Sequence, residues 1–426
     1  MQLLDSEGNI SNNADAFIKE CKKKSKSIRI HKESGMHMIE LASFPSVNVQ
    51  NVALHMIRGL KTVYDVADMN NLIVYPFSLY PIQFTPKMRE KSWYRIQQRI
   101  LGKKKFSISG KVTGFHFHYT LPRGVFDRKT KFLKPMLNSK IKQTLIDSYN
   151  LAIATDPFLI GVMQSSPIYN NRILAKDSRV LLYRGGSALK YPHGMYTGYT
   201  QYGGLPPYKQ TLTDLIYSLK SRHARMKRML ETHDVPARDI SRYGKTLDFC
   251  WGPVRINKLG TIEQRSSDMN NMDIIIAASV LMKYVQRKVH QDFLRVIPSE
   301  IGIDEPFKVE DNILHIPPHT HVRKQLQYLS AYKGLDDHHV HNYCSRFFKF
   351  AKNVINKRYE KAIKPIGDMI DEKKTVSDQI ISFIKKEGYG PEEKIPDETL
   401  KRMCLRVSEK NRRLLHRSEK IVSKLE

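Results

Sequence analysis

The segment Gly260–Asp268, with the sequence Gly-Thr-Ile-Glu-Gln-Arg-Ser-Ser-Asp, constrains the fold of this chain more than any other stretch. It is typical of a β-strand, in which successive side chains point to opposite faces. We therefore expect Thr261, Glu263 and Arg265 on one face and Ile262 on the other. A carboxylate beside a guanidinium on one face can hold a cation and a phosphate side by side. A solvated ion pair on a surface strand would give the same pattern.

Basic residues strongly outnumber acidic ones, with 71 Lys and Arg against 42 Asp and Glu and a formal net charge of +29 over 426 residues. Such a surface attracts polyanions, which indicates either a nucleic-acid binder or a protein that collects a nucleotide and an acidic substrate. The basic residues are densest in Lys220–Arg228 and Lys401–Lys424, but they occur throughout the chain. This distribution also fits a general Lys/Arg bias over solvated surfaces, and no aromatic-rich recognition signature accompanies it.

Neither the apolar runs nor the cysteines indicate a membrane or a secreted protein. No apolar run approaches the ~20 residues that span a bilayer, and the N-terminus lacks a basic stretch followed by an apolar one. The four cysteines, which are Cys21, Cys250, Cys344 and Cys404, form no Cys-x-x-Cys pair. We therefore expect a soluble cytoplasmic protein with free thiols rather than disulfides or a zinc site.

The pattern of apolar residues predicts an α+β protein in which strands are separated by helices and long loops. Helices are predicted over residues 14–24, 47–69, 93–101, 140–154, 211–232 and 273–292. Strands are predicted over residues 36–41, 72–75 and 111–121, and the Gly-, Tyr- and Pro-rich residues 177–207 are expected to form an ordered loop. After about Tyr343 the chain becomes charged, helix-forming and poor in Gly. We predict a domain over residues 1–345 and a charged helical extension over residues 346–426.

Three further segments carry polar groups that can converge with the opening strand. Glu33 and Glu40 bracket an apolar stretch, and His116 and His118 share one strand face. Arg184 precedes two glycines, with Arg179 as a rival nearby. Carboxylates and imidazoles can bind a hard divalent ion, and arginine binds phosphate or carboxylate groups in a bidentate manner. Taken singly, each segment is also explained by unrelated acids, a half-exposed strand or a loop charge.

In this order, the segments resemble the glutamate–cysteine ligase / carboxylate–amine ligase family, which shares the glutamine-synthetase-like fold. Glu33–Glu40 is similar to the acid-x6-Glu element of that family, Gly114–His118 to its Gly-x-His element, and Gly260–Asp268 to its Glu-x-Arg-x-x-Asp element. Weaker similarity runs from Gln2 to about Tyr343. The resemblance implies an antiparallel sheet flanked by helices.

The resemblance also implies an ATP-dependent reaction with Mg²⁺. ATP would phosphorylate the γ-carboxylate of glutamate, and an amine such as that of cysteine would attack the acyl phosphate to form a γ-glutamyl amide. The implied metal ligands are Glu33, Glu40, His116 and Glu263. The same family roles imply that Arg265 and Glu263 are catalytic, that His116 and Arg265 contact the cofactor phosphates, and that Arg184 holds a substrate carboxylate.

One departure from the family leaves the activity of this chain open. The family carries a Glu-x-Glu pair on its first strand, before a segment like Gln2–Asp5, whereas this sequence begins at Met1. We expect a truncated start. The alternative is a basic nucleic-acid-binding protein on an inactive ligase-like fold. A third hypothesis is a structural partner protein that uses its C-terminal helices. The sequence identifies neither the acceptor amine nor the oligomeric state.

Overall fold

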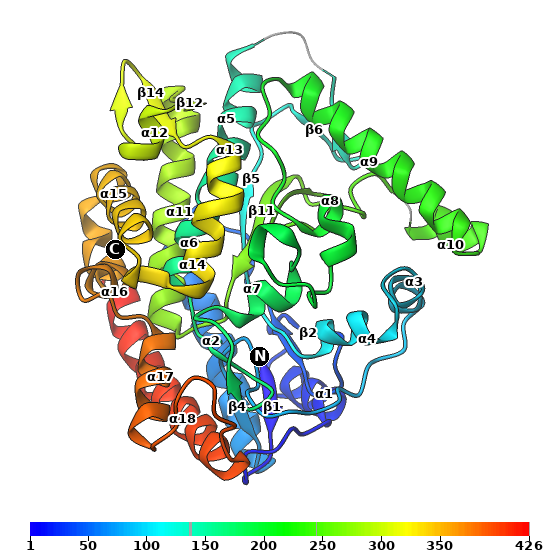
Figure 1. Ribbon diagram of the computed structural model, residues 1–426, viewed down its shortest axis with the longest axis vertical. Helices are drawn as coiled ribbons and strands as arrows, with labels where there is room; N and C mark the ends of the chain where they lie inside the picture. The colour runs from blue at the N-terminus through cyan, green and yellow to red at the C-terminus, as the bar shows by residue number, and fades with distance from the viewer. Residues whose placement is uncertain (136–138, 244, 426) are drawn as a thin grey trace.

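The computed structural model describes residues 1–135, 139–243 and 245–425 and shows an α+β architecture (Figure 1). At its centre lies an antiparallel sheet in the order β10-β11-β5, formed by β10 (Val254–Asn257), β11 (Thr261–Ser267) and β5 (Phe115–Thr120). The helices α5 (Lys140–Ala154), α6 (Asp156–Val162) and α11 (Met272–Asp292) pack against this sheet. The predicted fold class is confirmed.

Alternation along the strands divides the central sheet into an apolar face and a polar face. Val254, Ile256 and Ile262 are buried in the main hydrophobic core on one face. The residues between them therefore point the other way. In the register of the sheet, Glu263 lies opposite Arg255 on β10 and opposite His118 on β5. The polar face thus collects residues from all three strands.

The N-terminal part adds two short antiparallel pairs beside this sheet. β1 (Gln2–Leu4) pairs with β4 (Ile73–Tyr75), and β2 (Ile30–Lys32) pairs with β3 (Ile39–Leu41). They are covered by α1 (Ala14–Lys24) and α2 (Val49–Met69), whose apolar residues enter the same core. The β2–β3 pair places His31 opposite Glu40. It carries both acids of the second predicted segment, with Glu33 just after β2 and Glu40 on β3.

The remaining elements are mostly short helices and two- or three-stranded sheets. Residues 177–207 contain α7 (Ser178–Tyr183) and α8 (Thr200–Gly203) rather than loop alone. A three-stranded sheet that was not predicted is formed by β12 (Arg295–Pro298), β14 (Ile313–Ile316) and β13 (Val309–Glu310). The other bounds are α3 (Ser92–Leu101), α4 (Lys103–Phe106), β6 (Phe126–Asp127), β7 (Phe132–Leu133), β8 (Ile168–Tyr169), β9 (Arg172–Ile173), α9 (Leu212–Thr232), α10 (Ala237–Tyr243), α12 (Ile301–Asp304), α13 (His319–His321) and α14 (Gln327–Tyr332).

The C-terminal region is helical, as predicted, and shares the main core. It comprises α15 (His338–Val354), α16 (Glu360–Asp371), α17 (Val376–Lys386) and α18 (Asp397–Val422). Phe347 on α15 stacks against Phe158 on α6 with ring centroids 4.3 Å apart. On α18, Asn411 accepts a hydrogen bond from the Tyr64 hydroxyl of α2 at 2.7 Å. The core is therefore continuous across residue 345, which lies inside α15, and the division of the chain at that point stays a prediction.

In the described part of the chain, no helix combines the length and the apolar character that crossing a membrane requires. All four cysteines are buried and carry free thiols.

Because α15 shares the main core, we predict a large loss of stability when the side chain of Phe347 on α15 is shortened. Phe347 also contacts Phe307 with centroids 4.9 Å apart, so Phe347→Ala removes two aromatic contacts and leaves a cavity. We expect a loss of about 3–5 kcal/mol in the free energy of unfolding, measured by urea denaturation. Tyr217→Ala, at a side chain that is 72% exposed, is the control and should change stability by less than about 0.5 kcal/mol. A loss below about 1 kcal/mol for Phe347→Ala would show that α15 contributes little to the core.

Candidate functional site

The Glu263 carboxylate lies at the centre of the polar face of the sheet, with only 1% of the residue exposed. Its Oε2 accepts a hydrogen bond from Arg255 Nε at 2.6 Å and another from the side-chain amide of Asn257. Its Oε1 lies 3.5 Å from His116 Nδ1 and 3.7 Å from Arg265 Nε. Two strands of the sheet thus supply two guanidiniums to one carboxylate, with the imidazole of a third strand beside it.

The charges of this group fix its protonation states at neutral pH. Burial opposes ionisation of Glu263, but the guanidiniums of Arg265 and Arg255 outweigh it and hold the pKa of the carboxyl well below its ordinary value. Burial, followed by the positive charge of Arg265, lowers the pKa of His116 well below 6.5, although Glu263 acts in the opposite direction. Glu263 is therefore ionised and His116 neutral. A neutral imidazole is the form that can ligate a metal or accept a proton.

Glu33 and Glu40 approach the same polar face from the β2–β3 pair. Glu40 reaches solvent, yet the surrounding protein partly desolvates it, and this effect together with the charge of Glu33 raises its pKa to about 7. Arg265 and Glu263 also act on the titration of Glu40, in opposite directions. The structure therefore brings Glu33, Glu40, His116, Glu263 and Arg265 into one electrostatic neighbourhood.

An arginine that the sequence interpretation missed holds the loop that carries Glu33. The guanidinium of Arg89 is buried and donates hydrogen bonds to the backbone carbonyls of Glu33 and Gly35. Its charge is balanced by Asp15, at 2.7 Å. Arg89 thereby fixes the backbone on which the acidic pair depends.

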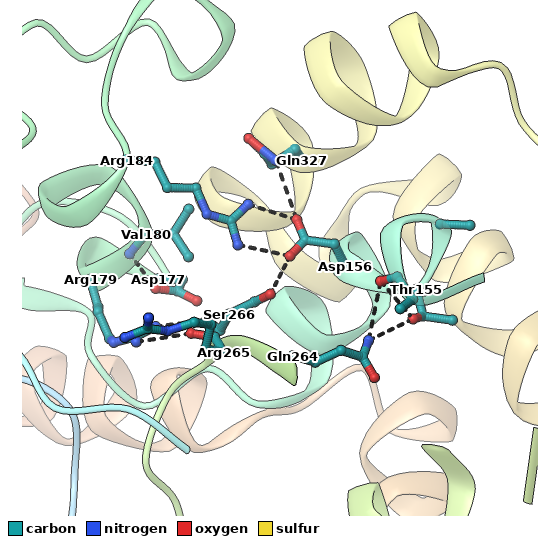
Figure 2. A network of polar contacts seen from close by, with 12 residues as sticks. Thr155, Asp156, Asp177, Arg179, Val180, Arg184, Gln264, Arg265, Ser266 and Gln327 are labelled. Carbon is teal, nitrogen blue, oxygen red and sulfur yellow. Dashed lines mark hydrogen bonds and ion pairs between the residues drawn. The ribbon is translucent and has the colours of Figure 1, made fainter. Parts of the chain in front are cut away.

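The two arginines of the fourth predicted segment lie beneath β11 in a buried polar network (Figure 2). Arg184 donates to both carboxylate oxygens of Asp156 at 2.6 and 2.8 Å, and the two residues are 3% and 0% exposed. Ser266 and Gln327 donate to the same carboxylate. The structure does not bring Arg184 into contact with Glu263 or its neighbours, so its role in substrate binding stays a prediction.

Arg179 binds the backbone of β11. Its guanidinium donates to the carbonyl oxygens of Ser266 at 2.7 Å and Arg265 at 3.2 Å (Figure 2). These contacts lie at the register shift between Gln264 and Ser267, where the pairing of β11 with β5 is irregular. A Cβ atom on Gly114 would come within 2.1 Å of Arg179 Nη2. A side chain at the glycine of the Gly-x-His element would therefore displace the Arg179 guanidinium from its present position.

Asp268, the last residue of the opening segment, anchors the end of β11. Its carboxylate accepts hydrogen bonds from the Ser165 backbone N–H at 2.9 Å and from the Ser166 hydroxyl at 2.7 Å. Burial raises the pKa of Asp268, although Arg179 opposes this shift. Asp268 thus has a positioning role in the strand and lies off the polar face.

The predicted metal ligands fit a divalent cation only in part. Among the residues that the structure describes, no three His, Cys, Asp or Glu side chains are grouped so that they could hold a metal ion. Glu263 is already neutralised by two guanidiniums. Glu33 and Glu40 offer carboxylate oxygens, which are ligands that Mg²⁺ prefers, and the charge of Glu33 acts on the titration of Glu40. A metal-binding role for Glu33, Glu40, His116 and Glu263 stays a prediction.

The Asp156–Arg184 pair predicts a strong stability effect that is independent of any substrate. Arg184→Met leaves a buried, unpaired carboxylate and should cost about 3–5 kcal/mol in the free energy of unfolding. The double variant Arg184→Met/Asp156→Leu removes both charges and should recover only part of that loss in the same denaturation experiment, because Ser266 and Gln327 lose their buried acceptor. If Arg184→Met keeps the wild-type stability, the pair is not the structural element described here.

The raised pKa of Glu40 predicts a pH-dependent stability difference. Because the native pKa, about 7, lies above the ordinary value of 4.5, the contribution of Glu40 to stability is fully present below pH 4.5 and is lost as the pH rises toward 7. Glu40→Gln removes this loss. Its melting temperature should therefore exceed that of the wild type at pH 8, and the difference should close toward pH 4.5. A constant difference across this range, or none, would contradict the assigned environment of Glu40.

Comparisons with known proteins show the fold of the chain but no family. No protein-family model matches the sequence, and no curated protein matches it. Among solved structures, the chain is similar to the crystal structure of a glutamate–cysteine ligase from Francisella tularensis in complex with AMP, with a TM-score of 0.56. The similarity covers 100% of this chain and 91% of that one, at 13% sequence identity. The chain therefore has a ligase-like fold that is distantly similar to that of glutamate–cysteine ligase.

Proposed function

We propose that this chain is an ATP-dependent carboxylate–amine ligase that forms a γ-glutamyl amide. The observation that carries the proposal is the gathering of Glu33, Glu40 and Glu263 with the Arg265 guanidinium and the neutral His116 imidazole beside the polar face of the central sheet. The AMP bound to the structural neighbour supports a nucleotide as a reactant. Glutamate and an amine such as cysteine are the proposed substrates.

In the proposed reaction, an oxygen of the glutamate γ-carboxylate attacks the γ-phosphorus of ATP, and ADP leaves. The amine nitrogen then attacks the acyl carbon, the amide C–N bond forms, and phosphate leaves with the oxygen that came from the carboxylate. Both steps develop negative charge on phosphoryl oxygens, which preorganised cations stabilise. ATP would enter as its Mg²⁺ complex, and Mg²⁺ would neutralise charge on the phosphates.

Arg265 is the residue that we propose stabilises the transferring phosphoryl group. Its guanidinium is held beside Glu263 by the strand geometry, and Arg179 fixes its backbone carbonyl from below. Glu263 would therefore act by orienting Arg265 and balancing its charge. Glu33 and Glu40 are the carboxylates that we propose contact the Mg²⁺ of the nucleotide.

The proposal predicts that ADP release requires both substrates together. In a coupled ADP assay, glutamate plus an amine should give turnover well above either alone, with cysteine, ammonia and other amines compared to identify the acceptor. ADP release that is indifferent to glutamate would contradict the proposed reaction. No turnover with any amine, together with tight salt-sensitive nucleic-acid binding, would favour the alternative of an inactive fold.

Glu40→Gln gives the cleanest test of a site residue, because Glu40 is solvent-accessible and its replacement should not unfold the chain. We expect glutamate-dependent ADP release to fall by about 10²–10³. The matched control is Glu231→Gln, at an exposed acid on α9, which should keep the wild-type rate. An unchanged rate in Glu40→Gln would remove Glu40 from the site.

Glu263→Gln needs a stability measurement alongside the rate. The change would leave the Arg255 guanidinium without its carboxylate partner and would destabilise the fold. A lower rate could therefore reflect unfolding as well as the loss of a catalytic group. A variant that melts near the wild-type temperature and still loses ADP release would support the proposed role of Glu263. A variant that melts near that temperature and keeps its rate would contradict it.

A further inference from the structure

A cavity of about 560 Å³ lies between α3 and α10, away from the polar face of the central sheet. Four arginines line it, with a single acid, Asp239, among the other lining residues. The arginines are Arg95, Arg99, Arg238 and Arg242. Each helix thus contributes a pair spaced i, i+4, which places both members on the same side of their helix.

The fold holds the two helices in place through apolar contacts beneath the arginines. Ile96 and Ile100 of α3 belong to the same buried cluster as Met226 and Leu230 of α9 and Val235, which precedes α10. Each isoleucine is the next residue after an arginine of the cavity. Burial of the isoleucines therefore fixes the side of α3 from which Arg95 and Arg99 project.

Two arginines of this cavity have no acid paired with them in the part of the chain that the structure describes. Within residues 1–135, 139–243 and 245–425, neither Arg95 nor Arg238 forms an ion pair, and Arg99 donates to the Asp234 backbone carbonyl at 2.8 Å. The basic helix α18 differs, because three of its arginines pair with carboxylates. These pairs are Arg402–Glu387, Arg412–Asp68 and Arg413–Glu409. The cavity is distinguished from that helix by the convergence of four arginines on one space.

Further basic residues extend the charge beyond the cavity. Lys103 and Lys104 of α4 are exposed next to α3, and Arg225, Lys227 and Arg228 are exposed on α9. Figure 1 shows α9 reaching outward to α10 at the edge of the molecule, with α3 and α4 below. A surface of this length matches an extended polyanion better than a single small anion.

We propose that this arginine groove, formed by α3, α10 and the adjoining parts of α4 and α9, binds the phosphodiester backbone of a nucleic acid. Arginine pairs in a bidentate manner with phosphate oxygens, and such contacts position a strand without reading its sequence. No aromatic side chain lines the cavity among the described residues, so base stacking contributes little. Binding is therefore sequence-independent and weakens steeply with salt.

An anionic membrane is the less favoured partner for this surface. Peripheral membrane binding combines basic residues with apolar side chains that insert between lipids. Across the described parts of α3, α4 and α10, no large apolar side chain is among the strongly exposed ones of the chain. The only such residue on the neighbouring α9 is Tyr217.

The test compares two charge-matched triple variants by fluorescence polarisation with a labelled 20-nucleotide single-stranded DNA. The groove variant is Arg95→Gln/Arg99→Gln/Arg238→Gln. The control is Lys352→Gln/Lys361→Gln/Lys386→Gln, at exposed lysines on α15, α16 and α17. At 100 mM salt, the groove variant should bind about 10-fold to 10²-fold more weakly than the wild type, and its log–log salt slope should fall by about 2. The control should stay within about twofold of the wild type.

Three results would overturn the proposal. The first is a control variant that weakens as much as the groove variant, since overall charge would then explain binding. The second is the absence of measurable binding by the wild type at 50 mM salt. The third is a groove variant that loses binding to phosphatidylserine vesicles but keeps binding to DNA. Melting temperatures of both variants confirm that they fold. The groove variant should keep the wild-type rate of glutamate-dependent ADP release, so a failure of the ligase proposal and a failure of this proposal can be told apart.

Discussion

The buried carboxylate of Asp156 is the interaction on which the rest of the structure depends. It sits beneath the central sheet and accepts hydrogen bonds from Arg184 just after α7, Ser266 on β11 and Gln327 on α14. Four elements that lie far apart in the sequence therefore meet at one charge. Because such a pair is costly to break once it is buried, it holds the irregular end of β11 in a single position. Glu263 and Arg265, on the opposite face of that strand, are thereby held on a fixed backbone.

The fixed position of β11 sets the positions of the charged groups on the polar face. Glu263 stays ionised because two guanidiniums outweigh its burial, and Arg265 is held beside it at 3.7 Å. The acidic pair Glu33 and Glu40 comes from a separate hairpin, whose loop is held by Arg89. Preorganised charge of this kind needs little rearrangement during a reaction, which is the condition under which fixed dipoles and charges lower a barrier.

The sequence predicts correctly those features that depend on the two-residue alternation of side chains along a single strand. Alternation in residues 115–119 and 261–265 predicted which side chains share a face, because that pattern depends only on the strand itself. It could not identify Arg255 and Asn257, since their role depends on the register of β10, or Asp156, whose partner Arg184 lies 28 residues away. The predicted helix over residues 140–154 matches α5, whereas the sheet of β12, β13 and β14 was missed because its strands are only two to four residues long.

The most direct test of the central claim follows oxygen from glutamate into phosphate. Glutamate carrying ¹⁸O in both γ-carboxylate oxygens is incubated with ATP, Mg²⁺, the acceptor amine and the protein, and the released phosphate is analysed by mass spectrometry. An acyl-phosphate pathway on this fold transfers one ¹⁸O to each phosphate, in step with the formation of the γ-glutamyl amide. Phosphate without ¹⁸O would mean that ATP is hydrolysed by water, and the polar face of the sheet would then not be the site of a carboxylate–amine ligase.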